Sequence, residues 1–580
     1  MQSKNKLFTV TLLSLAIAAT FTACSSTDES VVADASTAAA PAAASSGASN
    51  SKMEEIQVTG SRITRDAATS EGRMARNAAI GVAQSAAQMA PAPYIAAQPP
   101  ITENYADITD NGIKRSSVEP VSTFSIDVDT GSYSNVRRFL NNGQLPPADA
   151  VRTEELVNYF AYEYPAAATD GAPFSVVSEI AASPWHPGRH LLQIGIEAVE
   201  PSQAKDLRSN LVFLVDVSGS MNSPDKLDLL KTSLKLLTHQ LDKDDTIALV
   251  VYAGASGVVL EPTTGDHTAQ ITYALDRLQA GGGTNGEAGI QLAYSLAQQQ
   301  FIDGGINRVL LATDGDFNVG VSNFDDLKKL IEDKRKTGIS LTTLGFGTGN
   351  YNDQLMEQLA DAGNGNYAYI DNINEARKVL VDEMASTLQT VAKDVKIQIE
   401  FNPSVVSEYR LVGYENRVLA QEDFNNDKID AGEIGAGHGV TALYELTLVG
   451  SNAGSVDPLR YGPPLVDRAI PLLQPAELGW LKLRYKQPAG GASELLERPL
   501  LVADIEDDLD GTSADYRFAA AVAGFAQLLR DNQALGDFDY EDVIKMAMTA
   551  KQDDEFGYRS EFINLVKTAQ ALATTDLANR

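Results

Sequence analysis

Three short polar motifs of this sequence carry side chains that could hold a metal ion. Their oxygen-bearing residues are Asp216, Ser218, Ser220, Thr284 and Asp314. No histidine or cysteine lies near any of the three motifs in the sequence. Carboxylate and hydroxyl oxygens are the ligands that hard divalent cations prefer. The motifs therefore predict a site for Mg²⁺, with Ca²⁺ and Mn²⁺ as the alternatives.

The charge and the number of these groups indicate what such a site would do. Two carboxylates balance one divalent cation, and Mg²⁺ prefers six ligands. Five protein groups, some of them acting through water, leave one position open. A carboxylate from a partner protein would fill that position and form a direct ionic bond with the cation. The alternative is that the five residues are polar turn and cap residues at strand ends.

Buried strands and amphipathic helices alternate around these motifs. Strands buried on both faces are typically continuous apolar runs, and such runs lie at 211–215, 247–251, 309–312 and 341–344. Helical periodicity separates them at about 227–241, 286–300, 323–337 and 353–362. The pattern predicts an α/β fold with a doubly wound, mostly parallel sheet. Ligand sites of such sheets lie at the carboxyl ends of the strands, where Asp216 and Asp314 fall.

Taken together, the three motifs resemble those of the von Willebrand factor type A domain and its metal-ion-dependent adhesion site. The matching positions are Asp216-Val217-Ser218-Gly219-Ser220, Gly281-Gly282-Gly283-Thr284-Asn285 and Thr313-Asp314-Gly315. The resemblance covers about residues 208–390 and implies a Rossmann-like fold. It also implies that Ser218 and Ser220 bind the metal directly and that Thr284 does so in the ligand-bound form. The two aspartates would bind partly through water.

Strand-like alternation precedes and follows this predicted domain. It occurs at about 120–200 and again after about 392, and a helical tail runs from about 514 to 575. We expect the two β-rich flanks to pack together, because each is a small sheet with one face to bury. Segments 124–140 and 433–438 resemble the domains on either side of the A domain in a bacterial envelope lipoprotein family.

The only cysteine, Cys24, ends a segment that resembles a bacterial lipoprotein signal. Lys4 and Lys6 form a basic region, and the apolar run after them is too short for a comfortable membrane span. Phe21 departs from the pattern, which usually has Leu, Val or Ile there. Ser25 is not the aspartate that retains such proteins at the inner membrane, so the resemblance implies lipid anchoring at the outer membrane, in the periplasm or on the surface. The alternative is a plain secretory signal.

Low-complexity sequence follows the cysteine. The segment is rich in Ala, Ser, Pro and Gly and nearly free of large aromatics, which predicts a disordered tether. Within it, residues 54–65 resemble the start of the plug region of TonB-dependent outer-membrane receptors. This stretch is either chance β-prone sequence or a short docking strand for an envelope partner.

These patterns divide the chain into five predicted parts. They are a signal peptide at 1–23, the lipidated cysteine and tether at 24–105, an N-terminal von Willebrand-associated domain at 106–207, the type A domain at 208–391 and a C-terminal β-rich plus helical domain at 392–580.

The charge of the chain restricts its partners. The 580 residues carry a formal net charge of −31, and removing residues 1–23 takes away two lysines and no acid, which gives 44 − 77 = −33. This charge argues against nucleic acid and anionic lipid as partners. One cysteine excludes an internal disulfide framework and a multi-cysteine metal site.

We therefore expect a non-enzymatic, metal-dependent protein-binding lipoprotein of the bacterial envelope, acting as an adhesin or scaffold. Its partner would present an acidic side chain to the cation. One alternative is an envelope assembly protein in which the metal only stabilises the fold. Another is an enzyme that uses the metal to activate water, with Glu287 near the glycine-rich loop as its base.

Overall fold

A computed structural model describes residues 103–167, 171–199, 207–315, 324–456 and 476–579. The predicted signal peptide, the lipidated Cys24, the tether up to residue 102 and the plug-like segment 54–65 lie outside the described residues. Among the helices in the described ranges, none has both the length and the apolar character needed to cross a membrane.

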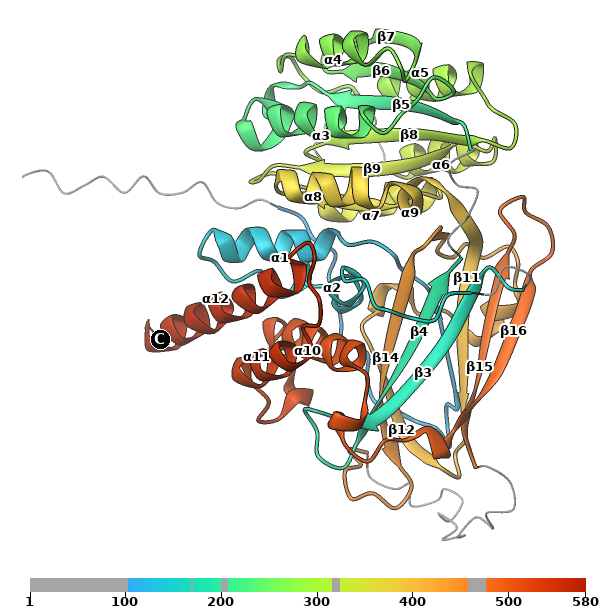
Figure 1. Ribbon diagram of the computed structural model, residues 1–580, viewed down its shortest axis with the longest axis vertical. Helices are drawn as coiled ribbons and strands as arrows, with labels where there is room; N and C mark the ends of the chain where they lie inside the picture. The colour runs from blue at the N-terminus through green and yellow to red at the C-terminus, as the bar shows by residue number, and fades with distance from the viewer. Residues whose placement is uncertain (1–102, 168–170, 200–206, 316–323, 457–475, 580) are drawn as a thin grey trace, which may run out of the picture. The chain divides into compact units, whose positions relative to one another are not determined.

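A six-stranded sheet forms the centre of the α/β unit (Figure 1). Its strands in spatial order are β10 (Tyr367–Ile370), β9 (Ser340–Phe346), β8 (Ile306–Thr313), β5 (Ser209–Asp216), β6 (Thr246–Tyr252) and β7 (Ser256–Thr264). Every neighbouring pair is parallel except β6 and β7. The predicted mostly parallel sheet is therefore confirmed.

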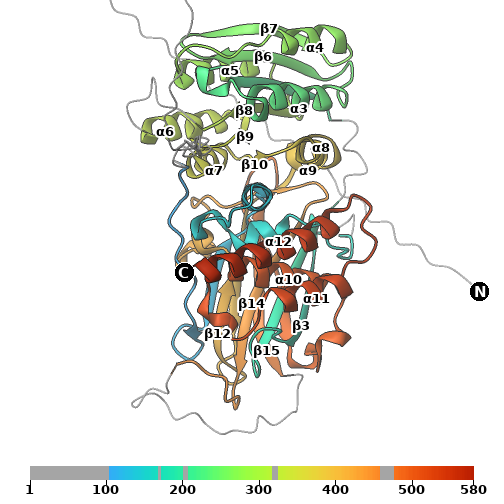
Figure 2. The same ribbon diagram turned by 90° about the vertical axis from the view of Figure 1, so that its left-hand side faces the viewer.

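Helices cover both faces of this sheet (Figure 2). The side chains of Leu211, Phe213 and Val215 belong to one core, whereas Val212 and Leu214 belong to another, as expected for alternate residues of one strand. The helices of the first core are α3 (Leu229–Thr238), α4 (Thr268–Asp276), α8 (Ile373–Arg377) and α9 (Met384–Leu388). Those of the second are α5 (Gly286–Gln299), α6 (Phe324–Arg335) and α7 (Asp353–Ala362). The sheet is thus doubly wound, as predicted.

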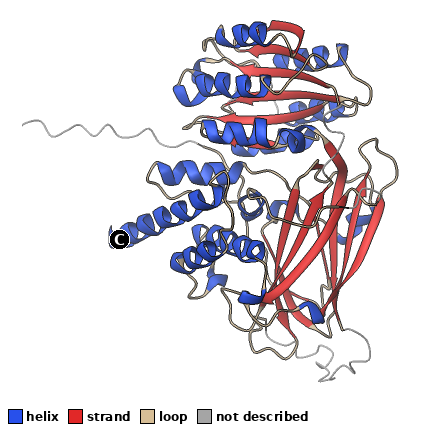
Figure 3. Cartoon of the chain, in the orientation of Figure 1, coloured by secondary structure: helices blue, strands red, loops and turns tan. Residues whose placement is uncertain are grey.

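Strands from both flanks build two further sheets (Figure 3). One has the order β1 (Lys114–Arg115), β12 (Val406–Val412), β14 (Gly439–Leu448), β4 (His190–Ala198) and β3 (Phe174–Ala182). The other has the order β13 (Ile434–Gly435), β11 (Thr390–Phe401), β15 (Glu477–Lys486) and β16 (Glu494–Leu501), and β2 (Val121–Ser125) also pairs with β11. Both sheets therefore combine strands from before and after the α/β unit.

A shared apolar core joins these two sheets. Ile194 and Tyr444 of the first sheet lie in one buried cluster with Ile397 and Leu481 of the second. The β-rich flanks thus pair and pack together, as expected from their alternating sequence. Removing these apolar surfaces from water is the main stabilising term for the two sheets.

A helical layer packs on the other face of the first sheet. Its helices are α1 (Gly131–Asn141), α2 (Thr153–Asn158), α10 (Ala514–Leu529), α11 (Tyr540–Thr549) and α12 (Tyr558–Asn579). Phe518 and Phe562 of this layer share a buried core with Leu191 and Leu443 of the sheet. Helices α1 and α2 also face the α/β unit, because Asn135 of α1 and Glu155 of α2 lie beside residues of α7.

Candidate metal centre

Asp216 and Asp314 lie side by side because their strands do. Strand β5 ends at Asp216, its parallel neighbour β8 ends at Thr313, and Val215 is paired with Ala312. The Thr313 hydroxyl donates a 2.8 Å hydrogen bond to Asp216 Oδ2. Both aspartates are 0% exposed. The carboxyl edge of the sheet therefore holds two adjacent buried carboxyl groups, as the positions of the motifs predict.

The loop after β5 brings two hydroxyl groups to the same edge. The backbone N–H of Ser218 donates to Asp216 Oδ1 at 2.8 Å, which folds the loop back over the strand end. The hydroxyl oxygens of Ser218 and Ser220 then lie 2.9 Å apart. Ser218 is buried and Ser220 is exposed, so the hydroxyl pair reaches from the buried aspartate to the surface.

The glycine-rich loop is tied to this first loop through the backbone. Gly219 N–H donates to the carbonyl of Gly282 at 3.1 Å, and Gly281 N–H donates to that of Val217 at 2.8 Å. Gly282 has φ = +89°, a backbone conformation that glycine adopts without strain. Thr284 follows in this loop and is buried. The two loops that carry three of the five predicted ligands, Ser218, Ser220 and Thr284, are thus in direct contact.

Lys226 also reaches this edge, although no motif of the sequence includes it. It lies in a π-helical turn (Pro224–Asp228) that precedes α3. Its Nζ donates to Asp314 Oδ2 at 2.8 Å and to Asn350 Oδ1 at 3.0 Å. Short π-helical segments occur frequently at functional sites, but a lysine in a first helical turn has no distinguishing pattern in the sequence.

Burial sets the protonation of the carboxyl edge. It raises the pKa of Asp216 to about 6, against the lowering effect of the hydrogen bonds from Ser218 and Thr313. The nearby Asp314 carboxylate raises the pKa of Asp216 further, by a smaller amount. A cation bound here would favour the ionised form of Asp216, because an opposite charge stabilises a carboxylate.

The donor set fits a hard divalent cation. Two carboxyl groups and two hydroxyl groups face one edge, and Thr284 lies in the loop that contacts them. All of these donors are oxygens, which suits Mg²⁺, Ca²⁺ or Mn²⁺. That these residues bind a metal remains a prediction. When bound, such an ion would offer a positive charge to an acidic group of a partner.

A second group of acidic residues is not predicted as a site from the sequence, although one of its members, Asp127, lies in segment 124–140. Asp127, Glu155 and Glu357 each place a carboxylate oxygen within 4.8 Å of the others, and all three are buried. Arg417 donates to Asp127 Oδ2 at 3.1 Å and to Glu357 Oε1 at 3.2 Å. A metal ion would have to compete with this guanidinium. The three acids come from segments far apart in the chain, so no spacing in the sequence links them.

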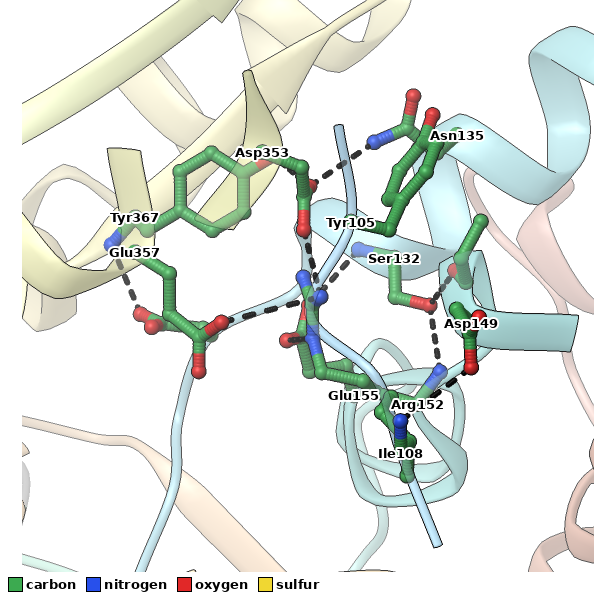
Figure 4. A network of polar contacts seen from close by, with 12 residues as sticks. Tyr105, Ile108, Ser132, Asn135, Asp149, Arg152, Glu155, Asp353, Glu357 and Tyr367 are labelled. Carbon is green, nitrogen blue, oxygen red and sulfur yellow. Dashed lines mark hydrogen bonds and ion pairs between the residues drawn. The ribbon is translucent and has the colours of Figure 1, made fainter. Parts of the chain in front are cut away.

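Arg152 completes this buried interface between α2 and α7 (Figure 4). It donates to Glu155 Oε1 and, at 2.6 Å, to Asp353 Oδ2. Tyr367 also donates to Asp353, at its other oxygen. Burial raises the pKa of Glu155 to about 7 and that of Glu357 to about 8, although Arg152 lowers both. The flanking domain is therefore joined to the α/β unit by buried ionic contacts.

Comparison with known protein families divides the chain into three matched regions. The model described as "von Willebrand factor" matches residues 99–193, and the von Willebrand factor type A domain matches residues 210–382. The model described as "Uncharacterized protein YfbK, C-terminal" matches residues 386–572. Domains of the type A class commonly bind a divalent metal, and they indicate a role in protein interaction or adhesion.

Relatives extend this match over most of the chain. The uncharacterized protein YfbK of Escherichia coli is 48% identical over 485 residues, which covers 83% of each chain. The uncharacterized protein sll0103 of Synechocystis is 24% identical and covers 53% of this chain and 69% of its own. A solved von Willebrand factor type A protein from Catenulispora acidiphila is 17% identical, covers 66% of this chain and 89% of its own, and has a TM-score of 0.37. By its identity to the Escherichia coli protein and by its three matched regions, the chain belongs to the YfbK family of von Willebrand factor type A domain proteins.

Proposed function

We propose that this chain is a protein-binding lipoprotein of the bacterial envelope that captures an acidic side chain of a partner through a divalent cation. Mg²⁺ is the ion we propose first, with Ca²⁺ or Mn²⁺ as alternatives. The metal ligands would be Asp216, Ser218, Ser220, Thr284 and Asp314. Since the type A domain indicates protein interaction or adhesion, the metal edge is the part of the domain that we assign to the partner.

One observation carries this proposal. Asp216 and Asp314 are fully buried at the ends of adjacent strands, while the hydroxyl groups of Ser218 and Ser220 extend from them towards the surface. Two buried carboxylates are costly without counter-charges. Lys226 supplies one at Asp314, and a divalent cation would supply the charge that Asp216 still lacks. An ion bound at this edge would keep one side open to a partner.

The anchoring and the charge of the chain support the same proposal. We propose that Cys24 carries the lipid and that the mature chain is held at the outer membrane, on its periplasmic or outer side. The mature chain is strongly acidic, so we propose no nucleic acid partner. A cation held between two acidic surfaces would allow an acidic partner to bind this anionic protein.

We propose no enzymatic activity. The candidate base, Glu287, accepts a hydrogen bond from Gln291 at 3.1 Å, one turn further along α5. Its Oε1 atom is therefore engaged by its own helix. A turnover screen in which Glu287→Ala loses activity would contradict this part of the proposal.

Proximity labelling in intact envelopes tests the proposed function. The native chain is compared with Asp216→Ala and with Asp276→Ala, which removes an exposed aspartate elsewhere in the α/β unit as a matched control. We expect the native chain and the control to label the same proteins. The Asp216→Ala substitution or EDTA treatment should abolish the labelling of these proteins. Unchanged labelling with Asp216→Ala contradicts the proposal. If labelling is unchanged and Mg²⁺ nevertheless raises the melting temperature of the native chain, the metal only stabilises the fold.

A further inference from the structure

A lysine side chain occupies part of the carboxyl edge that the metal would use. Lys226 is 6% exposed, and its ammonium group contacts Asp314 at 2.8 Å and Asn350 at 3.0 Å. Asp314 is one of the two carboxylates that would balance a divalent ion. The ammonium therefore already neutralises half of the acidic charge at this edge.

A glycine of the backbone leaves space for the lysine side chain. Gly347 follows β9 with φ = +80°, and a Cβ added there would clash with both Cγ and Cε of Lys226. Only a residue without a side chain leaves room for the lysine stem at this point. The lysine side chain thus packs against Gly347 of the β9–α7 loop (residues 347–352) on its way to Asp314.

The flanking region fixes this loop from its other side. The clasp segment (residues 103–105) forms two backbone hydrogen bonds, from Asn104 N–H to the carbonyl of Tyr351 at 2.9 Å and from Asp353 N–H to the carbonyl of Asn104 at 3.0 Å. The Glu103 carboxylate accepts from Gly349 N–H at 2.9 Å and pairs with Arg138. The loop that holds the second partner of Lys226 is therefore anchored through residues 103–105 to Arg138 of the flanking domain.

We propose that Lys226 is a built-in competitor of the divalent cation at this site. An ammonium ion and a divalent cation repel each other when both lie against one carboxylate, and the repulsion is strong where water is excluded. Metal binding then requires the ammonium to leave Asp314, and Asn350 offers it an alternative acceptor. Lys226 lowers the affinity of the site for the ion. The β9–α7 loop, which the clasp segment anchors, keeps the lysine side chain in place. This inference rests on the proposed function, because it assumes that the edge binds a divalent ion.

Calorimetric titration of the mature chain with MgCl₂ tests the competitor role. Lys226→Met keeps the length of the stem and removes the charge, and Lys226→Gln also keeps a donor for Asp314, in case the methionine variant does not fold. Lys235→Met removes a lysine on α3 that pairs with Asp276, and it is the matched control. Near-ultraviolet circular dichroism verifies that each variant is folded.

The charge-removing variants should bind Mg²⁺ at least about tenfold more tightly than the native chain, because a close repulsion is lost. The control should stay within about twofold of the native chain, because exposed charges are screened. Equal or weaker binding by the folded Lys226 variants overturns the competitor role while the proposed function stands. Absence of binding by the native chain and all variants overturns both. Binding by the variants and not by the native chain supports the competitor role and contradicts the proposed function of the native chain.

Discussion

The hydroxyl of Thr313 donates a hydrogen bond to Asp216, and this contact joins the ends of two neighbouring parallel strands at the proposed metal edge. The oxygens are 2.8 Å apart and both residues are fully buried. The bond favours the ionised form of Asp216 and fixes the direction of its second oxygen. It therefore prepares the carboxylate for a cation.

Replacing Thr313 by valine keeps the shape of the side chain and removes this donor. The variant should lose about 1–3 kcal/mol of unfolding free energy, because Asp216 loses a buried hydrogen bond and the Gly315 N–H loses its acceptor. It should also bind Mg²⁺ more weakly, since the ionised form of Asp216 is less favoured. Urea unfolding and calorimetric titration measure the two effects. Thr232→Val, at an exposed position of α3, is the control and should change neither quantity.

Arg152 should be a major contributor to the stability of the joined flank and α/β unit. Arg152→Met leaves Glu155 and Asp353 buried with one counter-charge fewer. The expected loss is about 3–5 kcal/mol of unfolding free energy, the range typical when one partner of a buried ion pair is removed. Urea denaturation checks it. Arg377→Met removes a mostly exposed arginine, and a loss of similar size in that variant would contradict the assignment to buried pairing.

Glu357 gives the interface a pH dependence with a defined sign. Burial raises its pKa from 4.5 to about 8, so the folded state binds a proton that the unfolded state releases between these values. The contribution of Glu357 to stability therefore falls as the pH rises from about 4.5 to about 8.

Glu357→Gln isolates this contribution because glutamine stays neutral. The unfolding free energy of the variant relative to the native chain should rise with pH, by at most about 1.4 kcal/mol per pH unit. Urea unfolding at pH 5, 6, 7 and 8 measures the difference. Glu422→Gln, at an exposed position, is the matched control. A difference for Glu357→Gln that stays flat or falls across this pH range would show that Glu357 is not protonated in the folded chain.

Cys24→Ser tests the predicted lipid anchor. The native chain should incorporate labelled fatty acid and fractionate with the outer membrane, because a thioether-linked lipid requires the cysteine. The serine variant should incorporate none and leave the membrane fraction. Label in the serine variant would show that the anchor lies elsewhere, and its absence from both chains would favour the plain secretory signal.

Much of the α/β unit follows from local sequence pattern. Continuous apolar runs such as 211–215 predict strands buried on both faces, and alternate residues of that run do enter two different cores. The positions of Asp216 and Asp314 follow from the same logic, because adjacent parallel strands end at one edge. The contact between the serine loop and the glycine-rich loop needed the family resemblance, since spacing in the chain does not determine loop packing.

The interactions of Lys226 and Arg152 could not be predicted in this way. Lys226 meets Asn350 across 124 residues of sequence, and Arg152 meets Asp353 across 201. Neither residue belongs to a motif. Lysine and arginine side chains are rarely buried, so the sequence alone predicts that both residues lie on the surface. Arg152 meets Asp353 because the flank packs against the α/β unit, whereas the folding of the α/β unit itself brings Lys226 to Asn350.

The metal content of the mature chain after equilibrium dialysis against Mg²⁺, Ca²⁺ and Mn²⁺ in turn decides whether this edge is a metal site. Elemental analysis would compare the native chain with Asp216→Ala, with Asp276→Ala as the control. We predict about one bound divalent ion per native or control chain and none in Asp216→Ala. Equal metal content in the native chain and Asp216→Ala, or none in either, would contradict a metal site at the ends of β5 and β8.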